Sequence, residues 1–283
     1  METEKKNRWI LAALVIPVIQ TASGTSWLWT AAALAVCRLL CWGVENYTGD
    51  APGWLKHLQG LWSIGILAEL ISWAGHCWPG GENTVHIPVL LMLLALFMAG
   101  KGRERTRQGA GILWWLILAL MLPTGIAGIR EIRWETLRHP LAWGNPALPA
   151  ILLLPGMTRG SGKHLWIPAM AASVIVQGVI WGIAGESPIY EMSRSLNLFG
   201  TVKRFESLTA IGMTLGYFLT MSYVLLGRGG KRPWIPAAAA IGVYLTGAEL
   251  TGVMLTVGTM VTEVVLPMAT ALKNNGKRNR KRG

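Results

Sequence analysis

Long apolar runs alternate with short polar segments along this whole chain, and the alternation predicts membrane helices. An α-helix needs about 20 mostly apolar residues to cross the hydrocarbon core of a bilayer. Ten runs approach this length, at residues 9–22, 26–43, 57–77, 84–100, 109–128, 142–156, 165–184, 206–226, 233–249 and 252–271. The pattern therefore predicts an all-α integral membrane protein with about ten transmembrane helices.

The composition supports a membrane protein over a soluble one. Hydrophobic residues make up 52% of the chain and charged residues only 14%, and there are 15 tryptophans. A soluble domain carries roughly 25% charged residues, while tryptophan is enriched where the bilayer meets water. Lys and Arg together number 26 against 14 acids. Binding of nucleic acid would need a solvated basic face, and a chain this apolar offers little solvated surface.

The basic residues gather in short clusters that predict an orientation. Clusters at residues 5–8, 101–107, 159–163, 228–232 and 273–282 all fall on one side when ten helices alternate from the N-terminus. Cytoplasmic loops carry an excess of Lys and Arg. Few basic residues fall on the other side, and these are Arg130, Arg133, Arg138, Arg194, Lys203 and Arg204. Both termini are therefore predicted to be cytoplasmic, in the cell membrane or an inner spore membrane.

Ten spans split into two halves of five, and an odd number of spans per half predicts halves of opposite orientation. Residues 1–283 form one membrane domain, in which 1–128 supply the first five helices, 142–271 supply the second five, and 272–283 form a basic cytoplasmic tail. Five helices per half place the second half upside down relative to the first. This is the arithmetic of an inverted-repeat transporter fold. The connections 129–141 and 185–205 have the spacing of amphipathic helices at the outer surface.

One segment resembles a known family. Residues 185–226 contain Pro188-x-x-Glu191-x-x-Arg194, followed by Arg204-x-Glu206 at the start of an apolar run. This resembles the spore germination permeases, the membrane B subunits of germinant receptors. There a Pro-x-x-Glu-x-x-Arg stretch precedes an Arg-x-Glu pair at the eighth helix. The stretch Ala22-Ser-Gly-Thr-Ser-Trp27 is also similar to the family's entry to its second helix, without the family's Asp.

The resemblance implies a fold, a role and partners. The fold would be that of the amino acid–polyamine–organocation superfamily, and the role would be sensing of small amino-acid-like germinants together with A- and C-type receptor subunits. An alternative is an amino acid or cation transporter of the same superfamily that works without receptor partners. A third is a membrane protein that has lost ligand binding. The first apolar run here, 9–22, is shorter than the first helix of that family.

The candidate ligand site lies where helices of an inverted repeat are expected to be broken. In such folds helices 1 and 6 are counterparts, and their unwound segments supply backbone groups to a small ligand. Proline removes a backbone donor and asparagine offers both donor and acceptor. The candidates are Gly144, Asn145 and Pro146 at the start of helix 6, Thr21, Ser23, Gly24 and Thr25 on the helix-1 side, and Gln177 in helix 7. A simple turn at a helix start would also suit Gly-Asn-Pro.

Two acidic residues lie in the middle of apolar runs. Glu69 occurs in the run 57–77 and Glu263 in the run 252–271. A charged side chain at the bilayer centre costs about 2.5–3.5 kcal/mol on insertion scales, so such residues face a cavity or a partner. Both are candidates for an ion or proton pathway. The alternative is a neutral acid that is hydrogen-bonded to a neighbouring helix.

The sequence offers no enzyme signature. It has no Gly-x-Ser-x-Gly, His-Glu-x-x-His or phosphate-binding loop. The histidines lie near the ends of the apolar runs, and the cysteines lie within or at the ends of such runs. We therefore expect no catalytic residues, no metal site and no cofactor.

Overall fold

The computed structural model describes residues 16–18, 21, 27–47, 52–77, 85–129, 145–154, 205–228 and 232–280. Every regular element in these residues is a helix, which confirms the all-α class. The elements are α2 (Trp27–Tyr47), α3 (Gly53–Gly75), α4 (His86–Gly100), α5 (Arg103–Ile129), α7 (Leu148–Leu153), α10 (Phe205–Arg228), α11 (Trp234–Leu245), α12 (Gly252–Met260), the π-helical turn η3 (Val261–Val265) and α13 (Leu266–Arg280).

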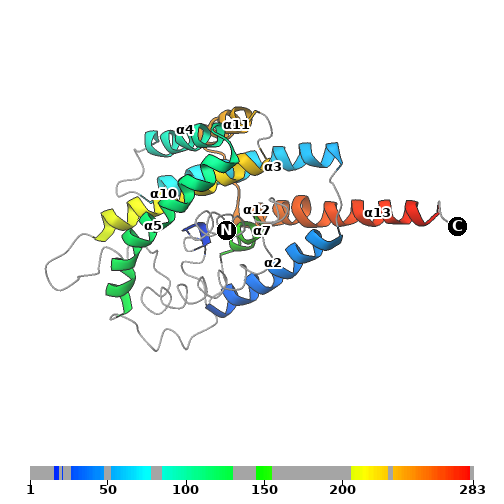
Figure 1. Ribbon diagram of the computed structural model, residues 1–283, viewed down its shortest axis with the longest axis horizontal. Coiled ribbons are helices and arrows are strands. Elements are labelled where there is room, and N and C mark those ends of the chain that lie inside the picture. The colour runs from blue at the N-terminus through cyan, green and yellow to red at the C-terminus, as the bar shows by residue number, and fades with distance from the viewer. Residues whose placement is uncertain are drawn as a thin grey trace.

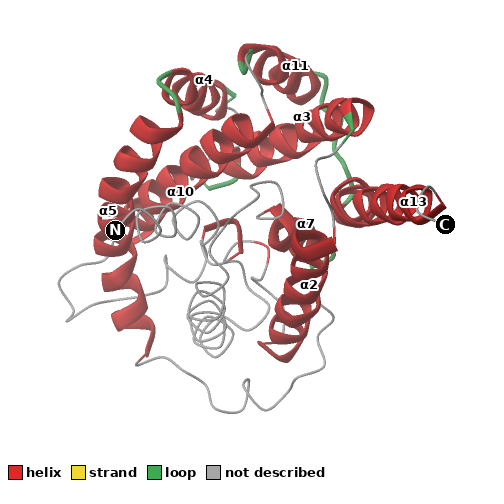
Figure 2. Cartoon of the chain, turned by 45° about the vertical axis from the view of Figure 1, so that its right-hand side comes forward, coloured by secondary structure: helices red, strands yellow, loops and turns green. Residues whose placement is uncertain are grey.

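Helix α10 is the centre of the packing. It contacts α5, α4 and α3, and α11 lies on α3. On the other side of α10, α2 and α12 both pack against the short helix α7 (Figure 1). Figure 2 shows α4 and α11 along one edge of the bundle and α2 with α7 on the opposite side, with α3 and α10 between them. Nearly all side chains from Thr209 to Leu225 of α10 are buried as a result.

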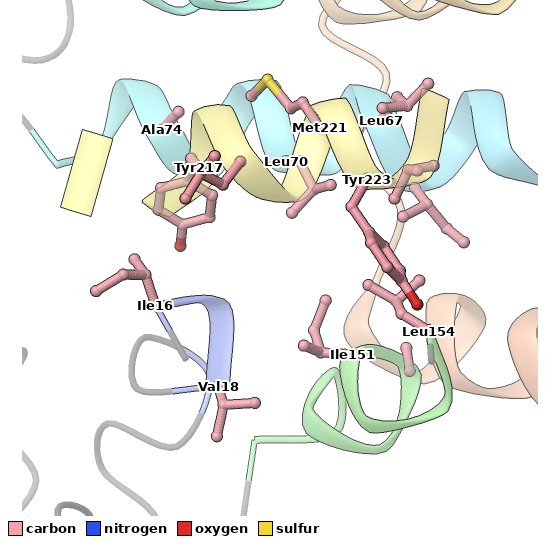
Figure 3. Close-up of a cluster of buried hydrophobic side chains, with 14 of the residues drawn as sticks. Ile16, Val18, Leu67, Leu70, Ala74, Ile151, Leu154, Tyr217, Met221 and Tyr223 are labelled. Carbon is pink, nitrogen blue, oxygen red and sulfur yellow. The ribbon is translucent and has the colours of Figure 1, made fainter. Parts of the chain in front are cut away.

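Two features let α10 bury most of its circumference, with Ile211 as an exposed exception. Its hydroxyl side chains donate back to carbonyls one turn earlier, as Thr214 does to Ala210 at 2.7 Å and Ser222 does to Phe218 at 2.8 Å. Such bonds satisfy a buried hydroxyl without a partner from another helix. Two tyrosines then reach across to other elements, with Tyr217 directed toward Ile16 and Tyr223 toward Leu154 (Figure 3).

Gly216 brings the segment around Ile16 close to α10. A Cβ at this position would overlap the Ile16 side chain. Gly212 and Gly216 are four residues apart, a spacing that lets helices approach closely. The glycine is therefore required for contact between the first apolar segment and α10.

Several helix boundaries differ from the apolar runs. α5 was expected from residue 109 but begins at Arg103, because Gly102 makes the turn after α4 with φ of +92° and the basic residues then continue as helix. α11 was expected to reach residue 249 but ends at Leu245, where Gly247 has φ of +68°. Glycine adopts this left-handed conformation without steric strain. The turns after α4 and α11 therefore form at positions that a glycine occupies.

The helix of the run 142–156 also begins later than expected. Within the described residues 145–154, Leu148–Leu153 is α-helical and 145–147 are not. Pro149 lies in its first turn, where a missing N–H is tolerated. Pro155, which has no N–H to continue the helix, follows Leu154 at the C-terminal end.

Two described helices are long and apolar enough to cross a membrane, Leu208–Arg228 and Gly252–Lys273. The first is mostly buried within the protein, as the core helix of a soluble protein also is, while the second is mostly exposed. Large apolar side chains are exposed on other helices too, including Leu90, Leu94 and Phe97 on α4. Exposed apolar surface of this extent is typical of contact with lipid or with another protein.

Some predictions fall outside the described residues. These are the run 165–184, most of the run 9–22, and the outer segments 129–141 and 185–205 apart from Ile129 and Phe205. Ten spans in two inverted halves therefore remain an expectation for the whole chain.

Candidate functional site

Glu69 meets the loop that precedes α12. Glu69 belongs to α3 and its side chain is buried. Its Oε1 accepts a hydrogen bond from the backbone N–H of Leu250 at 2.5 Å. Two residues later α12 begins, with Thr251 as its N-cap accepting from the Met254 N–H at 3.3 Å. The N-terminus of a helix carries a partial positive charge. The loop N–H and the nearby helix end together stabilise a carboxylate among apolar helices.

Asn145 and Pro146 lie against the same end of α12. Asn145 Oδ1 accepts from the Ala147 N–H at 2.9 Å, which closes a local turn before α7. A Cβ at Gly252 would come within 2.9 Å of the Ala147 nitrogen and 3.0 Å of Pro146 Cγ. The glycine at the start of α12 is therefore needed for this loop to approach.

Thr256 ties the loop to α12. Its hydroxyl donates to the Pro146 carbonyl at 2.5 Å and accepts from the Ala150 N–H at 3.2 Å. Through these bonds α12 and the start of α7 are held together. We call the group formed by Glu69, Asn145, Pro146, Leu250 and Thr256 the break site, because it lies at the connection between α11 and α12.

A second polar group lies further along the last helix. Arg228 donates through Nη1 to Gln59 Oε1 at 2.6 Å, and through Nη2 to Glu263 Oε2 in an ion pair. Gln59 Nε2 donates to Glu263 Oε2 at 3.3 Å and to the carbonyl of Thr262 at 3.0 Å. We call Gln59, Arg228 and Glu263 the buried cluster. It joins α3, α10 and η3.

The structure thus places the two candidate acids in different polar groups. Glu69 belongs to the break site and Glu263 to the buried cluster. On α3, Gln59 and Glu69 are ten residues apart, which corresponds to about 15 Å along a helix. Asn145 and Pro146 lie at the start of α12. Ser23, Gly24 and Thr25, which were expected beside them, lie outside the described residues, so the predicted pairing with helix 1 stays a prediction.

The other predicted residues fall into two groups. Thr21 is buried, and its hydroxyl donates to the Pro17 carbonyl at 2.7 Å, within its own turn. The remaining candidates lie outside the described residues, or have undescribed side chains in the case of Glu206, and they are Ser23, Gly24, Thr25, Gly144, Gln177, Pro188, Glu191, Arg194, Arg204 and Glu206.

Sequence reasoning missed Gln59, Arg228 and Thr256. Arg228 was taken as one more cytoplasmic charge, yet its side chain is mostly buried and turned toward Glu263. A basic residue in the last turn of an apolar helix and an acid in the middle of another are complementary. Their opposite charges could have predicted from the sequence that Arg228 and Glu263 form an ion pair.

The cysteines and acids do not form a metal centre within the described residues. No three His, Cys, Asp or Glu side chains come together there. Cys37, Cys41 and Cys77 are buried free thiols, and the Cys37 sulfur lies 3.8 Å from the Pro149 carbonyl oxygen.

In comparisons with known proteins, no family model and no curated protein matches the chain.

Proposed function

We propose that this chain is a permease-like membrane sensor of small amino-acid-like molecules, of the kind that germinant receptors contain. The break site carries the proposal. There the buried Glu69 carboxylate accepts from the Leu250 N–H, and the exposed turn at Asn145 and Pro146 packs on Gly252, both at the start of a membrane-length helix. In transporter folds, helix N-termini and irregular backbone that line a cavity hold small charged ligands. The resemblance of residues 188–206 to germination permeases supports the sensing role.

The proposal includes the membrane arrangement. Ten helices would form two inverted halves with both termini in the cytoplasm, and A- and C-type subunits would be the partners. The exposed apolar side chains on α4 and α12 suit contact with lipid. The basic clusters of the sequence suit the cytoplasmic edge.

Binding of amino acids to the purified full-length chain tests the proposal. In detergent, we expect at least one of the twenty amino acids to raise the melting temperature. At a hundred times its Kd, a ligand stabilises by about 2.7 kcal/mol, which is about 5–10 °C for a protein of this size. The variants Glu69→Gln and Asn145→Leu should lose this shift. Gln108→Leu, on the exposed side of α5, is the matched control and should keep it.

The contrary outcomes are distinct. If no amino acid shifts the melting temperature, or if the shift is the same in wild type and both variants, the break site is not the ligand site. If the isolated chain takes up the bound amino acid in proteoliposomes, it is a transporter rather than a receptor subunit.

A further inference from the structure

The last long helix changes its hydrogen-bond register at η3. The Leu266 N–H donates to the carbonyl of Val261, five residues earlier. In an α-helix this N–H would donate to Thr262, four residues earlier. The carbonyl of Thr262 has therefore lost its usual α-helical donor. Single π-helical turns inside α-helices occur frequently at functional sites.

Pro267 accounts for this turn. A proline inside a helix has no N–H and its ring clashes with the carbonyl four residues earlier, which here belongs to Glu263. The wider π-turn separates the ring from that carbonyl. For the same reason Pro267 cannot donate to Thr262 in the five-residue pattern. The carbonyl of Thr262 is thus left without a donor from its own helix.

Gln59 supplies the missing donor from another helix. Its Nε2 donates to the Thr262 carbonyl at 3.0 Å, and its Oε1 accepts from Arg228 at 2.6 Å. Arg228 also pairs with Glu263, which is itself part of η3. The buried cluster therefore holds the π-turn in place from α3 and from α10.

Helix α13 follows the turn, and much of the described surface of its first turns is exposed. It packs on α2, where Met268 Cε is 3.9 Å from the position a Cβ would take at Gly43. Leu272 is 72% exposed. Figure 1 shows α13 projecting away from the other helices toward the C-terminus. Its last turns carry Lys277, Arg278 and Arg280.

We propose that η3 is a register switch that turns α13 and its basic end. If Gln59 releases Thr262 and the helix kinks at Pro267, the Leu266 N–H can bond to Thr262 and the turn becomes α-helical. The kink moves the proline ring away from the Glu263 carbonyl. One residue of register corresponds to a rotation of about 100° and a rise of about 1.5 Å. A point about 5 Å from the helix axis then moves by about 8 Å. The trigger rests on the proposed sensing function, because the break site holds the other end of the same helix.

A distance between two spin labels tests the switch. Labels at Leu61 on α3 and Leu272 on α13 would lie on exposed positions, in a full-length chain whose native cysteines are replaced. The probe is double electron–electron resonance in lipid nanodiscs. We expect one distance in the parent chain. In the double variant Gln59→Leu with Pro267→Ala, we expect it to shift by several ångströms. Each single variant should show both distances.

A control variant at another proline, and amino acids added to the parent chain, distinguish failure of the switch from failure of the sensing function. Pro236→Ala, in the first turn of α11 where the N–H is not needed, should leave the distance unchanged. An unchanged distance in the double variant, with its melting transition intact, would overturn the switch. A shift in the double variant supports it even if no amino acid moves the distance in the parent chain. An unchanged distance in the parent chain with every amino acid would count against the sensing function and not against the switch.

Discussion

Removal of one partner from the buried cluster should destabilise the protein far more than removal of both. In Glu263→Leu, Arg228 keeps its hydrogen bond to Gln59 but loses the carboxylate that neutralises it. Breaking a buried ion pair from one side costs about 3–5 kcal/mol, because an uncompensated charge stays behind. Thermal unfolding in detergent, followed by tryptophan fluorescence, should then show a melting temperature lower by roughly 10 °C or more.

The double variant Glu263→Leu with Arg228→Met should recover most of this loss. Apolar replacement of a whole buried pair is often neutral or stabilising. Here the pair is also incompletely satisfied, since Glu263 Oε1 is buried and makes no hydrogen bond within the described residues. We therefore expect the double variant to melt within a few degrees of wild type.

An exposed pair provides the control. Glu104 and Arg107 lie 3.4 Å apart on α5, and Glu104 is largely exposed. Such pairs contribute about 0–1 kcal/mol, so Glu104→Leu should change the melting temperature by only a few degrees. If Glu263→Leu is as mild as Glu104→Leu, or if the double variant is as unstable as Glu263→Leu, the pair is not buried as described.

The remaining predictions concern packing, the break site and topology. A Cβ at Gly258 would overlap the Trp62 ring, so Gly258→Ala should destabilise by about 1–3 kcal/mol, whereas Gly242→Ala, with open space around it, should be neutral or stabilising; chemical denaturation measures both. Thr256→Val removes both hydrogen bonds between α12 and the segment around α7, so hydrogen exchange at residues 147–151 should accelerate, and unchanged exchange would contradict the role of the hydroxyl. In membrane vesicles, single cysteines in residues 101–108 should react only from the cytoplasmic side, and labelling from outside would reverse the proposed orientation.

The positions of the described helices could largely be predicted from the apolar runs. Some ends were predicted too, such as Gly100 of α4 and Gly252 of α12, and others were not. Hydropathy identifies residues that are stable in a membrane. A helix can also include charged residues, and it ends where the backbone leaves the helical conformation. This is why α5 includes the basic segment after Gly102, and why α13 continues to Arg280. The stops at Gly102 and Gly247 depend on φ values that many glycines in this chain do not adopt.

The candidate site was predicted in part for a similar reason. The cost of burying a carboxylate pointed to Glu69 and Glu263 from the sequence alone. Their partners are far away in the chain, as the 181 positions between Glu69 and Leu250 illustrate. The direction of the Arg228 side chain and the register change before Pro267 depend on contacts between helices. Periodicity within one helix carries no information about either.

Germination of a strain that lacks this gene tests the central claim most directly. We expect spores of the deletion strain to lose their response to at least one amino-acid-like nutrient. The wild-type chain should restore it, and a chain with Glu69→Leu and Asn145→Leu should not, although it is present in the spore membrane at the same level. Normal germination of the deletion strain with every nutrient, or full rescue by the double variant, would contradict the account.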